Sequence, residues 1–385
     1  MPAENTPTGN GLITSQFGEN KEPFEYALHL SIRGAYDDNI GLTHAMRLQD
    51  WFVQIQPSLM LAVGEVATQE TFIFVNYLPS FYRYDEHSEF DSDQHIGRFL
   101  AGYKWQNLIL RLSQDVAILN NTVLAASTSE RESLVPAGRT DLNIYNTDLS
   151  ANYNMTPRDF IFSELRMLRT VYALPLISSK VYSANLYLNH GFSQSFVLGA
   201  GVNGGNDVVD FPTPHQTFVQ ANAHLNFTPG PHFSVDVIAG EEFRDFENIT
   251  RSTYTTPVFS ISSAWAPNDN TRLSLSATRQ IYNSAAPTAQ DYVDTNVSAM
   301  IRERVCERLY VDVIGGYEHV QYFNTTNVPQ LTLSNDYWYV QPSADILLTR
   351  FWSFGAYYLR RQNSGSISTV DFYSNQFGVR TVIKF

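Results

Sequence analysis

Apolar and polar residues alternate along most of this chain, in segments of about 10–16 residues that begin at Phe24 and continue to the last residue. Successive side chains of a β-strand point to opposite faces, so each segment predicts a strand with one apolar and one polar face. We count about 18 such segments, with 16 as the alternative, because the pattern is weakest near residues 70–83, 140–154 and 194–204. No stretch approaches the ~18 consecutive apolar residues of a membrane helix.

The connections between these segments alternate between short and long. Short ones, such as NFTPGPHF and HGFSQSF, carry the Pro, Gly and Asn residues that form tight reversals. Long ones include YDDNIGLTHAMRLQD and YFNTTNVPQLTLSND. The sequence therefore predicts an all-β fold over residues 24–385: a closed antiparallel transmembrane β-barrel with short periplasmic turns and long extracellular loops. An even number of strands places both ends of this barrel on the short-turn, periplasmic side.

Residues 1–23 lie outside the alternating pattern. They are polar, with no basic flank and no apolar core, so they do not resemble a signal peptide. We expect a mature chain with an added Met1, or one whose leader is missing. The segment is too short for a domain and predicts a periplasmic tail that plugs the lumen or binds a partner.

Composition supports one apolar and one wet face. Aromatic residues make up 14% of the 385 residues, yet the mean hydropathy is only -0.22. The net charge of -13 and the lack of a basic stripe argue against a nucleic-acid partner. Cys306, the single cysteine, excludes an intrachain disulfide, and its role is open. Aromatic rings near predicted strand ends would form interfacial girdles: Tyr82, Trp105, Tyr153, Phe227, Trp265, Trp338, Trp352 and Phe385.

The last strand ends on an aromatic ring. One of its faces carries Phe377, Val379, Thr381, Ile383 and Phe385. This resembles the C-terminal strand of bacterial outer-membrane barrels, which the barrel-assembly machinery reads as an insertion signal. The resemblance implies that machinery as a partner, together with outer-membrane lipid and lipopolysaccharide.

A second resemblance lies near the start of the barrel. Tyr36–Ile40 reads YDDNI, and Gln56–Met60 reads QPSLM within a strand led by Trp51. This opening, about one tenth of the chain, is similar to that of the putative β-barrel porin 2 family. Related barrels occur in exopolysaccharide gene clusters, which implies a polysaccharide cargo and a periplasmic polysaccharide-export protein as partner.

The polar faces of the predicted strands carry charges of both signs, and a wet lumen is the place for them. An 18-stranded barrel has an aqueous interior, and the mixed signs do not predict strong ion selectivity. The loop around residues 120–139 is the best candidate to fold into the pore, and inward Tyr187, Tyr310 and Tyr339 either stack on sugars or fill the lumen. The predicted pore-lining residues are Arg33, Arg98, Arg111, Asp115, Arg166, Asp236, Glu242, Arg308, Asp312, Glu318, Asp345 and Arg380.

Other chemistry has weaker support. Nine histidines show no HExxH spacing, no GxSxG elbow is present, and GAGVNGGND lacks the pattern of a nucleotide-binding loop. Asp37 and Asp38 favour a turn over a hard-cation site. We expect no enzyme activity, cofactor or metal. The sequence favours an outer-membrane conduit for exopolysaccharide, with a general or solute-specific diffusion porin as the alternative. An outer-membrane hydrolase and a plugged, non-conducting barrel are the further rivals.

Overall fold

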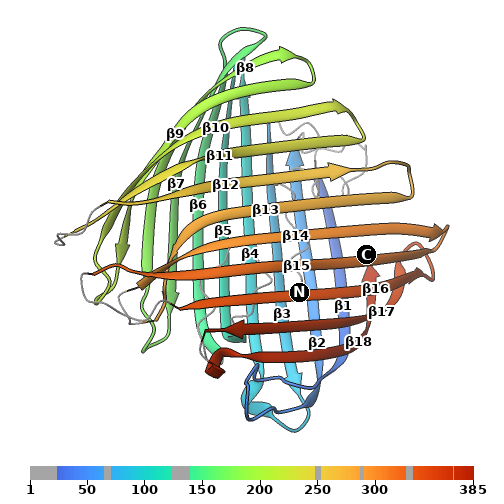
Figure 1. Cartoon of the computed structure of the whole chain (residues 1–385). Helices are drawn as coiled ribbons and strands as arrows, with labels where there is room; N and C mark the ends of the chain where they lie inside the picture. Colours follow the sequence, from blue (N-terminus) through green and yellow to red (C-terminus); the bar gives the residue numbers. More distant parts are fainter. Residues whose placement is uncertain are drawn as a thin grey trace.

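Eighteen antiparallel strands form one closed sheet in the computed structural model of this protein (Figure 1). The structure describes residues 24–64, 71–123, 139–247, 253–286, 290–326, 333–366 and 368–385. The predicted tail, residues 1–23, lies outside them. No helix among the described residues is long and apolar enough to cross a membrane.

The strands follow one another along the whole described chain, and two short 3-10 turns, η1 (Ser88–Phe90) and η2 (Ser368–Val370), accompany them. Their bounds are β1 Phe24–Asp37, β2 Asp50–Gly64, β3 Phe72–Tyr84, β4 Ser92–Trp105, β5 Leu108–Val123, β6 Arg139–Asn154, β7 Asp159–Tyr172, β8 Ser179–Ser193, β9 Phe196–Val209, β10 Gln216–Gly230, β11 Phe233–Phe246, β12 Tyr254–Trp265, β13 Thr271–Asn283, β14 Gln290–Cys306, β15 Leu309–Asn324, β16 Ser334–Leu347, β17 Trp352–Gly365 and β18 Phe372–Lys384.

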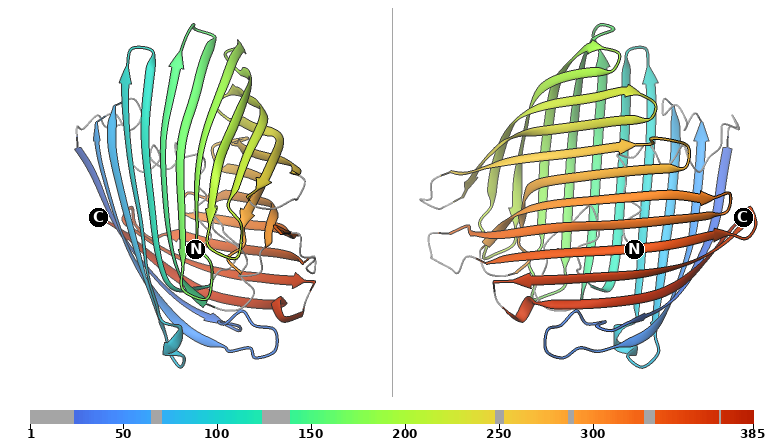
Figure 2. Two further views of the ribbon diagram at one scale, coloured as in Figure 1. Left: turned by 90° about the vertical axis from the view of Figure 1, so that its left-hand side faces the viewer. Right: turned by 45° about the vertical axis from the view of Figure 1, so that its right-hand side comes forward.

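Each strand pairs with its neighbours in sequence, and β1 pairs with β18 to close the barrel. The closing register places Leu30 opposite Ile383, and the Phe385 N–H donates to the Leu28 carbonyl at 2.8 Å. The two views of Figure 2 show the strands of one wall crossing over those of the opposite wall, as strong strand tilt requires. The prediction of a closed antiparallel barrel of 18 strands is confirmed.

The connections give the barrel two unlike ends. At one end, here called the short-turn rim, β4–β5, β8–β9, β10–β11 and β14–β15 are joined by two residues each. At the other end, the long-loop rim, β1–β2 are joined by residues 38–49 and β5–β6 by residues 124–138. Both ends of the strand array lie at the short-turn rim, because the number of strands is even.

The two faces of the wall differ as the alternation predicts. Leu186 and Leu188 on β8 face outward and are 47% and 58% exposed, whereas Asn189 on the same strand faces the interior and is 4% exposed. Buried polar side chains thus line the inside, and exposed apolar ones cover the outside. Seven of the eight predicted girdle rings lie on this outer surface; Tyr82 is the exception, because it faces inward and accepts a hydrogen bond from Gln54 Nε2 at 2.9 Å.

Large inward-facing side chains lie flat along the wall because a glycine faces them on the next strand. A Cβ placed on Gly201 of β9 would lie 2.4 Å from the Tyr187 ring of β8 and 2.6 Å from the Leu186 carbonyl oxygen. The same cross-strand pairing joins Phe72 to Gly102, Tyr339 to Gly316 and Tyr357 to Gly378. The glycine-rich segment GAGVNGGND is therefore a strand whose small residues accommodate a neighbour.

A charge on the outer face should cost far more stability than the same charge on the inner face. We expect Leu186→Arg, near the middle of β8, to lower the free energy of unfolding by about 2–4 kcal/mol. Asn185→Arg is the matched control, since Asn185 faces inward and donates to Glu164 at 3.3 Å. Denaturant unfolding in phospholipid vesicles measures both, and equal losses would contradict the assignment of the faces.

The glycine positions allow a second matched test on one strand. We expect Gly201→Ala to destabilise the barrel by about 1–3 kcal/mol, since the added methyl overpacks against Tyr187 and the β8 backbone. At Gly204 the nearest atom to an added Cβ is 3.4 Å away, so Gly204→Ala should change stability little. The same unfolding measurement decides, and a Gly204→Ala loss as large as that of Gly201→Ala would contradict the expectation.

Candidate functional site: the lumen wall and its long-loop mouth

The structure places eleven of the twelve predicted pore-lining residues on the inner face of strands. Arg308 is the exception, because it lies in the exposed two-residue turn between β14 and β15 at the short-turn rim. The inward-facing residues are Arg33, Arg98, Arg111, Asp115, Arg166, Asp236, Glu242, Asp312, Glu318, Asp345 and Arg380. Their role in conduction remains a proposal.

Ion pairs between nearby strands neutralise much of this inner charge. Arg302 of β14 contacts Asp312 of β15 with nitrogen–oxygen distances of 2.7 and 3.0 Å. Arg98 pairs with Asp115 in the same way, and Arg380 reaches Asp345 across the strand between them. The described inward residues therefore present both signs close together on the wall rather than charge of one sign.

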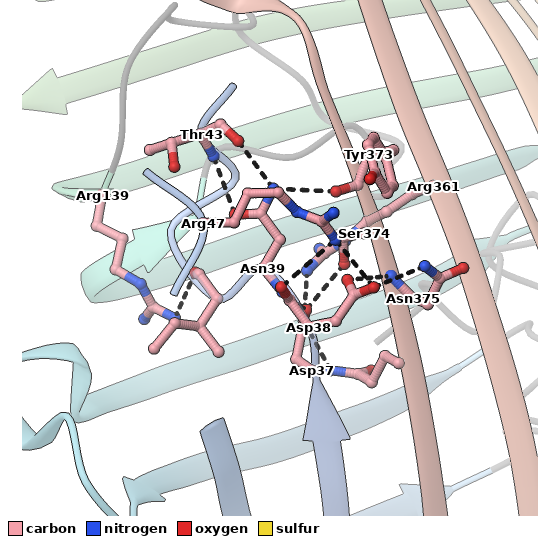
Figure 3. Close-up of polar contacts among 12 residues, drawn as sticks. Asp37, Asp38, Asn39, Thr43, Arg47, Arg139, Arg361, Tyr373, Ser374 and Asn375 are labelled. Atoms are coloured by element: carbon pink, nitrogen blue, oxygen red, sulfur yellow. Dashed lines mark hydrogen bonds and ion pairs between the residues drawn. The ribbon is translucent and has the colours of Figure 1, made fainter. Parts of the chain in front are cut away.

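The YDDNI segment connects loop 38–49, at the long-loop rim, to β17 and β18 (Figure 3). Asp37, buried to 2% exposure, accepts hydrogen bonds from Arg361 at 2.9 Å and from the Ser374 hydroxyl at 2.9 Å. It also accepts the Asn39 backbone N–H at 2.9 Å, which is the turn chemistry that Asp supplies. Among the described residues, no three His, Cys, Asp or Glu side chains converge as a metal site.

Asp38 points to the other side of the same strand end. Its carboxylate pairs with Arg47 at 2.9 Å and accepts the Asn375 backbone and side-chain N–H groups at 2.8 and 2.7 Å. Partial burial favours the neutral acid, but the hydrogen bonds from Asn375 and the charge of Arg47 together lower the pKa of Asp38 below its usual value. The acid therefore stays ionised and holds both ends of the loop at neutral pH.

Loop 38–49 enters the mouth of the barrel. Ile40 is 1% exposed, and its carbonyl accepts a hydrogen bond from Arg139 of β6 at 3.3 Å. Leu42 packs against an inward-facing cluster on β14, β15, β16 and β18. The buried members of that cluster are Tyr292, Val320, Tyr322, Tyr337 and Phe372. The loop thus bridges the β6 wall and the β14–β18 wall.

The long-loop end of the β13–β14 hairpin leans across the mouth from the other side. Pairing of β13 with β12 stops at Phe259 and Arg279, before β13 itself ends at Asn283. Beyond that point Asn283 donates to Asp207 of β9 at 2.7 Å, and the Ala285 carbonyl accepts the Ile177 N–H at 2.9 Å. Strands β9 and β13 are four positions apart in the wall, so these contacts require the hairpin to fold inward.

A buried polar cluster fastens the hairpin. Asp291 of β14 is 0% exposed and accepts the Gln216 side-chain N–H at 2.6 Å. Arg244 of β11, 4% exposed, donates to Glu242 at 2.7 Å and to Gln216 at 3.0 Å. Removing one member of such a network leaves a buried charge without its partner, which costs several kcal/mol. The hairpin is therefore held to the β9–β11 wall by charge-assisted hydrogen bonds.

The predicted pore-entering loop was placed elsewhere in the sequence. Residues 124–138, most of the loop around 120–139, lie outside the described residues. A signal for the inward hairpin was nevertheless present: Arg279, Asn283 and Asp291 occupy positions that the alternation assigns to the lipid face. Polar residues at three such positions are incompatible with a lipid-facing wall.

Four histidines contact an aspartate. They are His87 with Asp50, His190 with Asp159, His224 with Asp236 and His319 with Asp336, at 3.2, 2.6, 3.0 and 2.8 Å. Within the described part of the chain, no serine or threonine hydroxyl hydrogen bonds to any of these four rings. The pairs lie at separate places on the wall and rims, and none forms the nucleophile–base–acid arrangement of a hydrolase.

Part of the chain matches a known protein family. Residues 217–385 match the family model described as Putative beta-barrel porin 2. The matched part begins in β10, so the YDDNI and QPSLM segments lie outside it. No curated protein matches the chain.

Solved structures of bacterial proteins cover almost the whole chain at low identity. OccAB4 of Acinetobacter baumannii is 11% identical, with 94% of this chain and 98% of that chain covered and a TM-score of 0.47. OccK2 (OpdF) and OprD of Pseudomonas aeruginosa are each 9% identical, with TM-scores of 0.47 and 0.42. Each covers 94% of this chain, and 98% and 95% of those chains are covered in turn. The chain is a closed 18-stranded β-barrel, and its residues 217–385 match the model of the putative β-barrel porin 2 family.

Proposed function

We propose that the barrel is a diffusion channel for small polar solutes, with its selective constriction at the long-loop mouth. The observation that carries this proposal is the meeting of two inward elements there: loop 38–49 from one side and the β13–β14 hairpin from the other. A diffusion channel needs a constriction that discriminates by size, whereas a polymer exit needs a wide continuous path.

The chemistry of the wall supports polar solutes of low net charge. Arginine and carboxylate side chains pair along it, as with Arg302 and Asp312, so neither anions nor cations meet a continuous field of opposite sign. Asparagine, glutamine and serine side chains fill many of the remaining inward positions, including Asn146, Asn222 and Gln341. These groups offer donors and acceptors in place of the hydration that a solute loses.

Exopolysaccharide export is the second candidate. The inner wall carries many tyrosines, among them Tyr187, Tyr310 and Tyr339, and such rings stack on sugars. In this role the hairpin and loop 38–49 would have to withdraw when a periplasmic partner engages. Export therefore predicts a channel that is narrow alone and wide in the presence of that partner.

The test is permeation measured on the refolded full-length chain. In liposome-swelling assays we expect mono- and disaccharides to enter and dextrans of several kilodaltons to be excluded. Single-channel recordings in planar bilayers should show a steady conductance. Passage of the dextrans would favour the polymer conduit instead, and absence of any conductance would reject the open-channel proposal.

The hairpin contacts supply a sharper variant. Asn283→Ala with Asp291→Ala removes two hydrogen bonds to buried carboxylates, each worth at least about 1.5 kcal/mol, so the ratio of withdrawn to folded-in hairpin should rise by about a hundredfold or more. We expect a larger single-channel conductance and a higher size limit. Asn296→Ala, an inward change lower on β14, is the matched control. If the double variant conducts as the wild type does, the hairpin is not the constriction.

A further inference from the structure

Cations on the outer side of the wall near the long-loop rim mostly have acceptors within the chain. These are Arg47 with Asp38 at 2.9 Å, Arg83 with Asp93 at 2.7 Å and Arg360 with the Asn375 side-chain oxygen at 2.9 Å. Such partners satisfy the guanidinium groups without any ligand. Two outer cations of neighbouring strands differ from this pattern.

Arg169 of β7 and Lys180 of β8 face each other directly across the strand ladder. Both side chains point outward and are exposed, and neither makes a hydrogen bond or ion pair with another described side chain. Directly opposed side chains have Cβ atoms about 5 Å apart, and like charges in this arrangement repel. The repulsion between the two cations therefore destabilises this part of the sheet unless an anion binds between them.

The pair lies near the rim end of the apolar outer surface, where Val208 of β9, 40% exposed, is opposite Lys180. The next outward pair away from the rim is Met167 with Tyr182, and below it come Leu165 at 58% and Leu186 at 47% exposure. Towards the rim only the Thr170–Ser179 pair separates the cations from loop 173–178. Strands β7 and β8 stand side by side in Figure 1.

Tyrosines flank the cations. Tyr145 of β6 is directly opposite Arg169, and the exposed ring of Tyr182 follows Lys180 by two residues on the same face. Tyrosine concentrates at the boundary between hydrocarbon and headgroups, because its ring is apolar and its hydroxyl is polar. The cations are thus at headgroup depth, above the acyl chains.

Nearby carboxylates are already engaged. Asp141 of β6 accepts the Asn121 backbone N–H at 2.8 Å, and Asp210 accepts the Ser178 N–H at 3.2 Å. Neither lies within ion-pair distance of Arg169 or Lys180. The anion that neutralises the pair must therefore come from outside the chain.

We propose that Arg169 and Lys180 bind a phosphate of a phosphorylated glycolipid in the outer leaflet of the outer membrane. Arginine and lysine near a membrane surface bind lipid phosphates through charge-assisted hydrogen bonds. The acyl chains of the same lipid lie on the apolar surface of β7 and β8 directly below. This binding site faces away from the lumen and goes beyond the proposed transport function; it rests on the long-loop rim facing the outer leaflet.

The test is native mass spectrometry of the full-length barrel in detergent, titrated with diphosphorylated lipid A. We expect Arg169→Gln with Lys180→Gln to weaken lipid A binding roughly tenfold or more, because two surface cations are lost. Arg83→Gln is the matched control: Arg83 is an exposed outer cation already paired with Asp93. Wild-type binding should weaken as the salt concentration rises.

Three further probes make the result decisive. Dephosphorylated lipid A, inorganic phosphate and phosphatidylglycerol should each bind the wild type more weakly than lipid A does. Equal binding of lipid A by the double variant overturns the proposal. If the wild type binds dephosphorylated lipid A as tightly as lipid A, apolar contact alone explains binding. If it binds inorganic phosphate as tightly, the site takes free anions, and if it binds phosphatidylglycerol more tightly, the site takes a different lipid. Each of these three results also overturns the proposal.

Folding of the double variant is checked by the shift in gel mobility on heating and by single-channel conductance. Both should match the wild type, because the substituted side chains face away from the lumen. A change in conductance alone therefore concerns the transport proposal, and a change in lipid A binding alone concerns the glycolipid site.

Discussion

The hydrogen-bonded pairing of β1 with β18 is the constraint on which the rest of this molecule depends. Inside a bilayer no water satisfies a free backbone N–H or carbonyl, so a spanning sheet must have no edge. The pairing of β1 with β18 removes the last two edges and obliges every strand to tilt. Alternation, turn length and the apolar character of the final strand all follow from this closure.

The features that follow from the closed, alternating wall could be predicted from the sequence, whereas other features could not. The strand order, the two unlike rims and the inward direction of residues such as Arg98 and Asp312 follow from period-two alternation, since a residue's face is set by its parity within a strand. Tyr82 and Arg308 were misplaced because strand ends are the least certain part of such a prediction.

The contacts at the long-loop mouth could not be predicted from the sequence, for a different reason. Contacts such as Asn283 with Asp207 join residues that are far apart in the sequence and belong to strands that are not neighbours. Parity says which face a side chain occupies but not where a strand end bends once its ladder stops. The lone hint was local: polar residues at Arg279, Asn283 and Asp291 contradicted a lipid-facing position. Violations of the pattern, more than the pattern itself, marked the site.

The glycines opposite Tyr187, Tyr339 and Tyr357 have a consequence for how such a wall can vary. Each ring occupies volume that its neighbour's missing side chain leaves free, so the two positions share one allotment of space. If the large residue and the glycine exchange places across the ladder, the width of the lumen stays the same. Replacing only the glycine would overfill the space, and replacing only the large residue would leave it empty. The diameter of the lumen is thus a property of residue pairs, and its natural variation should appear as correlated substitution across neighbouring strands.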